Sequence, residues 1–292
     1  MTVLVAGATG DLGGLIAHGL LDQGADVRVL VREGSLYESL VAAGAKAVFG
    51  DLKEPDSLSG ACAGVDAVVT TVNSIGRGGD DDIESVDLKG NANLVDAAVA
   101  AGVRRFVFTS ALGAAADSPI EFLRAKGATE QRLRSSGMVT TVLQPNAYMD
   151  IWIPAVVGGA ALSGQPVALV GEGRRRHSFI ARRDVAGYAV AALDHEEAEG
   201  QTLVLGGPQP VTWRDVVGAF ERELGREIPV RTVAPGEAVP GRPPMMNQLL
   251  AAMDSYDSPV EMTAMAETFG VTPTSLDDFV HGFVAASRRA VG

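Results

Sequence analysis

The sequence predicts an α/β protein in which a doubly wound parallel sheet carries a smaller, mainly helical C-terminal lobe. Three observations support this fold. Short apolar runs, each too short for a helix, alternate with helical patterns through the first half of the chain. The first run passes through three glycines straight into a helix. The runs also place apolar residues at neighbouring positions, as in parallel strands that helices cover on both faces.

A glycine turn joins the first strand to the first helix. Residues 3–6 form the apolar run, and glycines follow at three-residue intervals. In such a unit the first glycine allows the turn, the second lets a pyrophosphate approach the main chain, and the third lets helix and strand pack closely. The free N–H groups of the helix then attract the phosphates. We therefore expect a dinucleotide site of Rossmann type, with contacts from Gly7, Thr9, Gly10, Asp11, Leu12 and Gly13; the alternative is a glycine-rich turn without a ligand.

The other elements of the first domain follow in order. The last of its helices runs from Ser118 to Gly137, and its start has a capping-box pattern, Ser118-Pro119-Ile120-Glu121, with proline at the first helical position. Repeated strand–helix units give a right-handed, doubly wound sheet, and residues 1–145 are the predicted dinucleotide-binding Rossmann domain. The expected strands are 27–31, 47–49, 66–71, 105–109 and 139–143, and the expected helices between them are 12–23, 56–63 and 83–101.

Residues 146–292 are the predicted substrate lobe, of which 165–207 partly return to the Rossmann sheet. Thr212 to Asp215 is a second capping-box pattern, and the helix that it opens ends at Gly225. Ligands of such sheets bind at the carboxyl edge, so this lobe is expected to form the substrate pocket. The expected strands are 167–170, 178–180, 202–205 and 228–233, and the mainly helical parts are 146–164 and 235–292.

The end of the second strand predicts the choice of dinucleotide. Arg32 stands where enzymes that prefer NAD place an acidic residue on the ribose hydroxyls. A guanidinium suits a 2′-phosphate, so we expect NADP (NADPH), with NAD possible if Glu33 binds the ribose instead. Leu52 and Thr71, at later strand ends, complete the expected contacts together with Asp51, which either touches the adenine or only fixes its turn.

The segment after the fourth strand is rich in glycine and aspartate. Residues 73–82 read N-S-I-G-R-G-G-D-D-D. A loop at the carboxyl end of a central strand is a usual place for a lid, and the alternative is simple surface disorder.

The composition limits the class of protein. The net charge of -12 argues against direct nucleic-acid binding, which depends on Lys and Arg. The only cysteine, Cys62, is expected to be a small apolar side chain in a helix, which fits a reducing compartment. No apolar run is long enough to cross a bilayer, and no signal peptide precedes the first strand. We expect a cytoplasmic protein, monomeric or homodimeric, whose partner is a small-molecule substrate.

Several of these motifs together resemble the NmrA-like, atypical short-chain dehydrogenase/reductase group. The motifs are V-A-G-A-T-G-D-L-G-G at the start, V-R at 31–32, G-D-L at 50–52, F-V-F-T-S at 106–110, Lys126 followed by E-Q-R-L-R-S-S-G, and F-I-A-R-R-D-V-A at 179–186. The similarity covers roughly residues 1–232. It implies the Rossmann fold and an NADP cofactor. Members of the group include NADPH-dependent quinone, isoflavone-type and benzylic-ether reductases, as well as regulators that bind the dinucleotide without turnover.

The resemblance also suggests the catalytic residues. The wider superfamily uses a serine, a tyrosine that delivers a proton, and a lysine four residues after the tyrosine. Ser110 and Lys126 stand in the matching places, but Phe122 replaces the tyrosine and has no proton to give. Lys126 is expected to bind the nicotinamide ribose and, with a pKa lowered by burial, to act as general acid or base; the alternative is a surface lysine. Ser110 orients the substrate or only satisfies nearby backbone.

Other polar residues give weaker predictions. Asn146, after the sixth strand, either reaches the nicotinamide or substrate or is a turn residue. The basic run Arg174-Arg175-Arg176 either holds an anion or is a solvated turn, and His177 is a proton donor or a structural histidine. No His or Cys grouping has metal-ligand spacing. An apolar acceptor would suit the lobe's large apolar side chains, unless these are ordinary core: Trp152, Met245, Met246, Met253, Met262 and Met265.

These patterns favour an NADPH-dependent reductase that transfers hydride to a small apolar acceptor, such as a quinone, an enone or a related aromatic or carbonyl compound. The alternative is a non-catalytic NADP(H)-binding redox sensor, in which Phe122 marks lost catalysis. A sugar-nucleotide epimerase is disfavoured, because that chemistry relies on the tyrosine.

Overall fold

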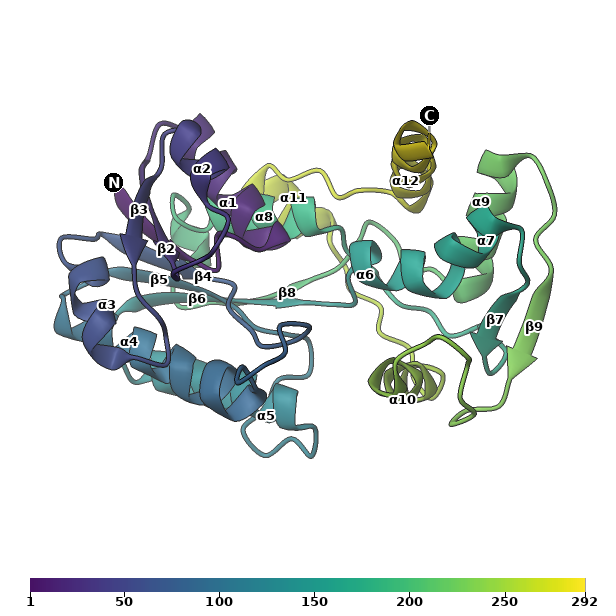
Figure 1. Ribbon diagram of the computed structural model, residues 1–292, viewed down its shortest axis with the longest axis horizontal. Helices are drawn as coiled ribbons and strands as arrows, with labels where there is room; N and C mark the ends of the chain where they lie inside the picture. The colour runs from purple at the N-terminus through teal and green to yellow at the C-terminus, as the bar shows by residue number, and fades with distance from the viewer. Residues whose placement is uncertain (292) are drawn as a thin grey trace. The chain divides into compact units, whose positions relative to one another are not determined.

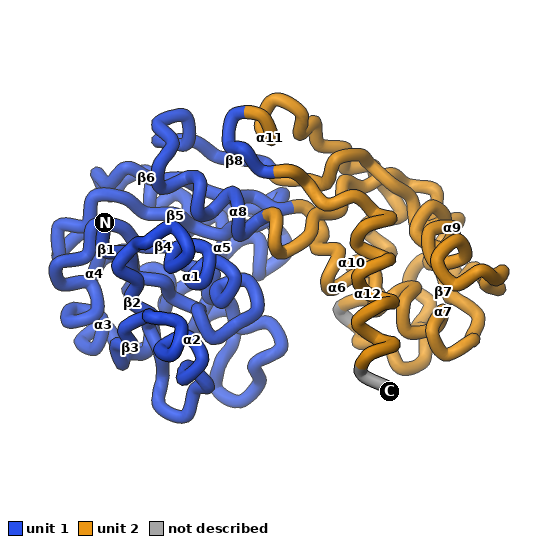
Figure 2. The backbone as a smooth tube through the Cα atoms, turned by 90° about the horizontal axis from the view of Figure 1, so that it is seen from above, with its two compact units in different colours: residues 1–145, 185–204, 268–271 blue, residues 146–184, 205–267, 272–292 orange. Residues whose placement is uncertain are grey.

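The computed structural model describes residues 1–291, although not the side chains of residues 245, 290 and 291. The chain folds into two compact units, which Figure 2 shows in different colours. Unit 1 consists of residues 1–145, 185–204 and 268–271. Unit 2 consists of residues 146–184, 205–267 and those from 272 onward.

Unit 1 is built on a seven-stranded sheet with the order β3-β2-β1-β4-β5-β6-β8. β1 pairs in parallel with both β2 and β4, so that Val5 lies opposite Val29 on one side and Val69 on the other. The chain therefore reverses its direction of strand addition between β1 and β4, and ligands of such sheets bind at this point. The strands are β1 Thr2–Ala6, β2 Asp26–Val31, β3 Lys46–Phe49, β4 Ala67–Thr70, β5 Arg105–Thr109, β6 Val139–Pro145 and β8 Thr202–Leu205.

Helices cover both faces of this sheet, as the sequence predicts for a doubly wound fold. α1 and α8 lie on one face, and α3, α4 and α5 lie on the other (Figure 1). On the second face Leu4, Val68 and Phe106 are fully buried against these helices. The helices of unit 1 are α1 Asp11–Asp22, α2 Glu38–Ala42, α3 Pro55–Cys62, η1 Ile83–Gly90, α4 Asn91–Ala100, α5 Glu121–Arg134, most of α8 Arg182–Ala191, and η3 Glu196–Ala198.

Two of the helices predicted in unit 1 differ from the prediction, and α2 was not predicted at all. The helix expected at residues 83–101 begins as a π-helix, η1, which Asp82 caps by accepting from the Ser85 amide at 2.7 Å, and continues as α4. The expected capping box at Ser118 is wrong. Ser118 Oγ accepts from the Ile120 amide at 3.2 Å, so that a local turn forms and α5 begins only at Glu121, with no side-chain cap.

Unit 2 combines helices with a small sheet of its own. β7 Val167–Val170 and β9 Val230–Val233 pair in parallel, with Val167 opposite Val230. Its core contains Phe179, Trp213 and Phe220. The predicted capping box at Thr212 is confirmed, because Thr212 Oγ1 accepts from the Asp215 amide at 3.0 Å. The helices are α6 Met149–Ile153, η2 Pro154–Gly158, α7 Gly159–Ser163, α9 Trp213–Leu224, α10 Pro244–Met253, most of α11 Thr263–Phe269, and α12 Leu276–Val291.

Of the strands predicted after residue 146, only 202–205 joins the large sheet, as β8. The strand expected at 178–180 is wrong. That segment makes isolated bridges, such as Tyr148 with Ile180, because its neighbours are loops rather than extended strands. None of the helices within residues 1–291 is long and apolar enough to cross a membrane.

Candidate functional site

Two glycines of the first turn are required by close packing. Gly7 has a φ of 86°, and a Cβ added to it would lie 2.6 Å from Thr71 Oγ1. A Cβ added to Gly13 would lie 2.1 Å from the Gly7 carbonyl oxygen. Real Cβ atoms do not approach other atoms so closely, so that these positions admit only glycine. The turn thus holds the start of α1 tightly against β1.

The N-terminus of α1 is left open by the same turn. Gly10 is its N-cap and offers no side chain to the first amides of the helix. A Cβ at Gly10 would meet only the Gly7 carbonyl oxygen, at 3.4 Å, so that glycine here leaves space beside the turn. Asp11 and Leu12 form the first turn of this 12-residue helix. Main-chain N–H groups and the helix dipole at such an end attract a phosphate.

A pocket extends from this turn along the carboxyl edge of the sheet. Gly7 and Thr9 line it at the turn, and Asp51 and Leu52 line it beyond β3. Thr71, which the sequence analysis also expects to contact the dinucleotide, packs on Gly7. The other residues that line the pocket are Leu30, Arg32, Ser35, Gly50, Val72, Arg77 and Val86. The main-chain cradle and the place of this pocket at the carboxyl edge of the sheet are those expected for a dinucleotide site.

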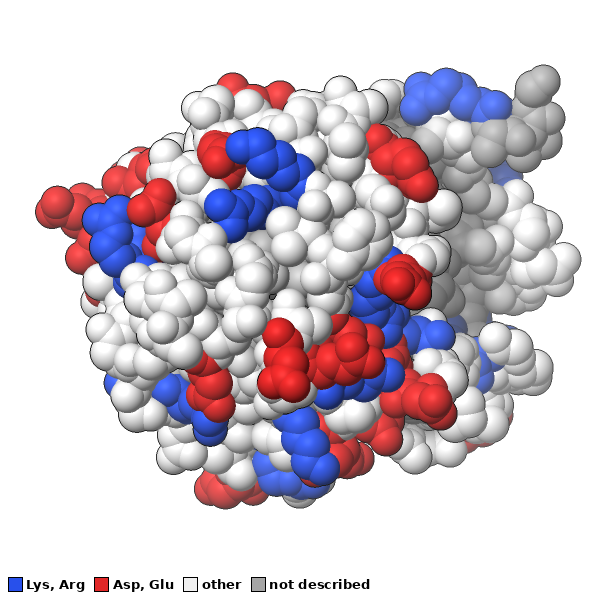
Figure 3. Space-filling view, turned by 60° about the vertical axis from the view of Figure 1, so that its left-hand side comes forward, with Lys and Arg blue, Asp and Glu red and all other residues white. Residues whose placement is uncertain are grey.

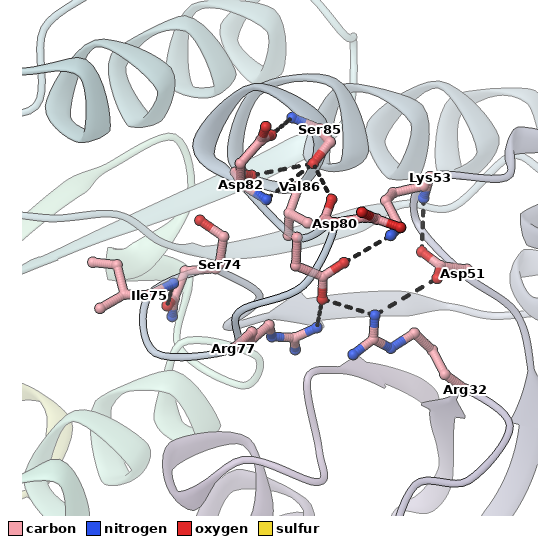
Figure 4. A network of polar contacts seen from close by, with 12 residues as sticks. Arg32, Asp51, Lys53, Ser74, Ile75, Arg77, Asp80, Asp82, Ser85 and Val86 are labelled. Carbon is pink, nitrogen blue, oxygen red and sulfur yellow. Dashed lines mark hydrogen bonds and ion pairs between the residues drawn. The ribbon is translucent and has the colours of Figure 1, made fainter.

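A cluster of cations lies at the end of the pocket. Arg32, Lys53 and Arg77 come from three segments of the chain and point toward one place (Figure 4). Asp81 occupies that place: its carboxylate lies 2.8 Å from Arg32 Nη1, 2.8 Å from Lys53 Nζ and 3.4 Å from Arg77 Nη1. Burial raises the pKa of Asp81, but the hydrogen bonds from Lys53 and Arg32 outweigh it and lower the pKa to about 2. The carboxylate is therefore ionised at neutral pH.

The sequence indicates only part of this cluster. Arg32 is in it as expected, whereas the alternative ribose ligand, Glu33, is exposed. Asp51 fixes its own turn by accepting from the Lys53 amide at 2.9 Å, and its carboxylate also lies 3.7 Å from Arg32 Nη1. The sequence analysis does not identify Lys53 or Arg77 as members of the cluster. Lys53 directly follows the G-D-L motif, which is a signal that could have pointed to it.

Lys126 is buried at the same edge of the sheet. Its side chain is 3 % exposed, which excludes the alternative of a surface lysine. Nζ donates to the Thr109 carbonyl at 3.1 Å and to the Val72 carbonyl at 3.4 Å. Val72 also lines the pocket and packs on Gly7, which connects Lys126 to the glycine turn. Burial lowers the pKa of Lys126 to about 8, although the charges of Asp87 and Glu130 oppose the shift.

Two aromatic rings lie beside the Lys126 ammonium, and one of them, Phe122, is at the position that the family resemblance assigns to a tyrosine. Nζ is 4.9 Å from the centre of the Phe108 ring and 5.5 Å from that of Phe122. A ring face attracts the cation but transfers no proton. Neither ring can therefore deliver a proton.

Ser110 has an acidic partner that the sequence analysis missed. Its hydroxyl donates to Glu130 Oε1 at 2.5 Å, so it neither stands alone nor merely satisfies backbone. Glu130 is 2 % exposed and also accepts from Gln144 Nε2 at 2.8 Å and from Arg134 Nη2 at 2.9 Å. Its spacing gives a signal, because Phe122, Lys126 and Glu130 follow one another at four-residue intervals on α5.

Asp87, on η1, is a second acidic residue that the sequence did not reveal. It is fully buried, and its Oδ2 accepts from the amide and the hydroxyl of Ser74 at 2.9 and 2.6 Å. Its Oδ1 has no hydrogen-bond partner within the described part of the chain and lies 4.0 Å from Lys126 Nζ. The first residues of the loop 73–82 are thus tied to the carboxylate that faces Lys126.

The polar groups predicted beyond residue 145 interact within unit 2. Asn146 Nδ2 donates to the Ser258 carbonyl at 2.9 Å and to its hydroxyl at 3.0 Å, and Asn146 Oδ1 accepts from the Ala147 amide. His177 is 1 % exposed and lies with Nδ1 2.7 Å from Ser258 Oγ. Burial lowers the pKa of His177, so the ring is neutral at pH 7. Its surroundings match a structural histidine.

The remaining candidates have structural surroundings. The pocket beside Arg174, Arg175 and Arg176 is also lined by three acidic residues, Glu172, Asp254 and Asp257, so that its charges are balanced. Acidic and basic side chains likewise lie side by side on the face in Figure 3. Cys62 is buried in α3, and burial raises its thiol pKa to about 11, as expected for an unreactive side chain.

Several of the large apolar side chains proposed for substrate binding belong to the core. Met253 and Met262 are buried, with 6 % and 2 % exposure. Trp152 and Met246 are partly buried and pack against the core of unit 2, and Met265 is also partly buried. The side chain of Met245 lies outside the described part of the chain.

Comparison with known proteins decides the family. The model of a family described as NAD(P)H-binding matches residues 7–196. An NAD(P)H azoreductase from Xenophilus azovorans is 30% identical over 291 residues, which cover 99% of this chain and 93% of the azoreductase. The chain belongs to the NAD(P)H-binding family. This membership confirms the predicted NmrA-like relationship and the nicotinamide cofactor, and the predicted oxidoreductase class agrees with this relative.

Two further similarities widen the comparison. The photosystem II assembly factor Ycf39 of Cyanophora paradoxa is 32% identical over 237 residues, 80% of this chain and 72% of that protein. The crystal structure of a Citrobacter sp. triphenylmethane reductase complexed with NADP(H) superposes with a TM-score of 0.80 at 26% identity, covering 95% of this chain and 98% of the reductase.

Proposed function

We propose that this protein is an NADPH-dependent reductase that transfers hydride to a small, largely apolar, conjugated acceptor. One observation carries the proposal: the buried ammonium of Lys126 donates to the Val72 carbonyl, and Val72 lines the pocket that begins at Gly7. A proton source and a dinucleotide cradle therefore adjoin within unit 1. The bound reduced nicotinamide would supply the hydride and its two electrons.

The chain's own residues would hold the cofactor in three places. The uncapped start of α1, next to Gly10, would bind the pyrophosphate. Arg32, Lys53 and Arg77 would bind a 2′-phosphate, since a phosphate accepts charge-assisted hydrogen bonds from several cations at once. Lys126 has three N–H donors, of which two serve Thr109 and Val72, and the third would serve the nicotinamide ribose or the substrate.

Lys126 would also donate the proton that the reduction requires. Hydride transfer to one atom of a conjugated acceptor leaves a negative charge on another, which one proton neutralises. With a pKa of about 8, Lys126 is mostly protonated at pH 7 and still acidic enough to act as general acid. Phe122 cannot take this role, because its ring has no ionisable group. Ser110, held by Glu130, would orient the acceptor.

The proposed acceptors are quinones, enones and related aromatic or azo compounds. The name of the azoreductase supports the azo compounds, and that of the triphenylmethane reductase supports extended aromatic acceptors. We further place the protein in the cytoplasm, as a monomer or homodimer, in accord with its single buried cysteine. Fractionation of cells and light scattering of the purified protein test these two points.

A non-catalytic NADP(H) sensor is the second candidate. Phe122 in place of the tyrosine favours it, and so does the similarity to an assembly factor. Consumption of NADPH, followed by absorbance with a panel of quinones, enones, azo dyes and triphenylmethane dyes, separates the two. Turnover that Lys126→Ala abolishes and that Lys89→Ala leaves unchanged supports the reductase, because Lys89 is exposed. Tight NADPH binding without consumption across the panel supports the sensor.

A further inference from the structure

Three consecutive aspartates at the end of the loop 73–82 have different surroundings. Asp80 is exposed. Asp82 is exposed and caps η1 through Ser85. The side chain of Asp81, between them, is only 7 % exposed and points into the cation cluster. The loop therefore buries one particular carboxylate in the place where the proposed function requires a phosphate.

The contacts of Asp81 are those that a phosphate would make. Arg32 directly follows β2, Lys53 follows β3 by a short turn, and Arg77 lies in the loop 73–82 itself, so three segments supply one cation each. Both carboxylate oxygens are used: Oδ1 binds Lys53, and Oδ2 binds Arg32 and Arg77. Removing the carboxylate would leave three positive charges close together and largely unpaired, apart from Asp51 near Arg32.

The loop 73–82 is held by side-chain hydrogen bonds at both ends and is rich in glycine between them. Ser74 binds Asp87 at one end, and the Asp82–Ser85 cap fixes the other. Gly76, Gly78 and Gly79, in the middle, have φ values of 79°, 71° and 65°. A Cβ added at any of the three would meet nothing within 4 Å. These glycines thus serve the backbone conformation rather than packing, and residues 75–80 around them are exposed.

We propose that Asp81 is a specificity-determining residue whose carboxylate holds the 2′-phosphate site closed until a phosphorylated dinucleotide displaces it. The inference rests on the proposed function, because it assigns Arg32, Lys53 and Arg77 to that phosphate. A dinucleotide without the phosphate leaves Asp81 in place. Asp81 therefore lowers the affinity for NADPH but not that for NADH. It thereby reduces the ratio of the two affinities.

The charges of the two anions decide which of them binds the cation cluster. A phosphate monoester carries a charge of about −1.5 to −2 and three acceptor oxygens, whereas Asp81 offers one charge and two oxygens. The phosphate therefore displaces the carboxylate, while neutral ribose hydroxyls do not. The apparent affinity falls by the fraction of molecules in which the site is open. If Asp81 occupies the cluster in about nine molecules of ten, its removal tightens phosphate binding roughly tenfold.

Calorimetry with two fragments of the cofactor tests this inference without any turnover. The probes are adenosine 2′,5′-bisphosphate, which carries the 2′-phosphate, and 5′-ADP, which does not. Asp81→Asn should bind the bisphosphate about tenfold more tightly than the wild type and bind 5′-ADP unchanged. Asp80→Asn is the matched control, since it removes the same charge from the next, exposed residue, and should change neither affinity. Asp81→Glu, which keeps a carboxylate, should stay closer to the wild type than Asp81→Asn.

Each other outcome has a definite meaning. If Asp81→Asn leaves bisphosphate binding unchanged or weakens it while 5′-ADP still binds, Asp81 is a support for the cations and the inference is wrong, although the proposed function stands. An equal gain in affinity for both nucleotides would also overturn the inference. The effect would then come from the lost negative charge in general and not from the 2′-phosphate site. If the wild type binds neither fragment nor NADPH, the proposed function fails and this inference fails with it. Circular dichroism and 5′-ADP binding verify that each variant is folded.

Discussion

Lys126 Nζ lies 4.0 Å from Asp87 Oδ1, and both side chains are buried. The two residues come from α5 and η1, and no other group donates to that carboxylate oxygen among the described residues. A buried charge pair of this kind favours the protonated form of the lysine, which burial alone disfavours. Asp87 is thus a positioning residue for the proposed acid.

Asp87→Asn should shift the pH dependence of reduction. Activity that needs the Lys126 ammonium is present below its pKa of about 8 and is lost as the pH rises through it. Without the Asp87 charge that pKa falls further, so the loss begins at a lower pH. The profile of kcat against pH measures this, with Glu84→Gln on the exposed side of η1 as control. An unshifted profile would mean that Asp87 does not act on the proton donor.

Lys126 also predicts a pH dependence of stability. Its pKa is about 8 in the folded chain and close to 10.5 when unfolded, so between these values the unfolded chain binds more protons. The free energy of unfolding should therefore rise from pH 8 to 10.5, by up to about 3 kcal/mol from this residue. Denaturant titrations of the wild type and Lys126→Met measure it, because the rise attributed to Lys126 should vanish in the variant. Parallel curves for the two proteins would contradict the buried ammonium.

Gly13→Ala should damage the first turn. The added Cβ would lie 2.1 Å from the Gly7 carbonyl oxygen, so α1 must move away from β1. We expect a loss of stability of about 1–3 kcal/mol together with weaker dinucleotide binding. Gly60→Ala on α3 is the matched control: its Cβ meets nothing within 4 Å, and the change should stabilise by about 0.5–1 kcal/mol. Thermal unfolding of both variants tests the comparison.

Arg32→Ala should weaken NADPH binding selectively. Arg32 donates to the carboxylate that stands in for the 2′-phosphate, and a lost hydrogen bond to a charged group costs about 1–3 kcal/mol. Binding of NADH should change little. Calorimetry with both dinucleotides measures the two losses, and equal weakening of NADH would refute the assignment of Arg32 to the phosphate.

The parts of the fold that the sequence predicts are those set by local pattern. The buried strands show as short apolar runs, and Gly7 and Gly13 mark a turn that only glycine permits. Ser118 misled the prediction because its hydroxyl bonds to the Ile120 amide in a local turn, an alternative that the capping pattern does not distinguish. The pairing of β7 with β9 depends on contacts between distant segments, which periodicity does not encode.

The site residues likewise include some that the sequence predicts and some that it does not. Arg32 and Lys126 could be found from their places at a strand end and on a helix. The carboxylates that define their surroundings, Asp81 and Asp87, could not, because a loop and a π-helix bring them there from positions that look like any acidic surface. Glu130 lies between these cases, since its four-residue spacing from Lys126 was visible.

Transfer of a labelled hydride tests the central claim most directly. The protein is given NADPH that carries deuterium at the transferable position of the nicotinamide, and a neutral acceptor that takes hydride at carbon, such as an enone. The account predicts one deuterium per molecule in a stable C–D bond of the product, with the second hydrogen drawn from solvent, and loss of product formation in Lys126→Ala. A reduced product without deuterium, or no product while NADPH is bound, would contradict it.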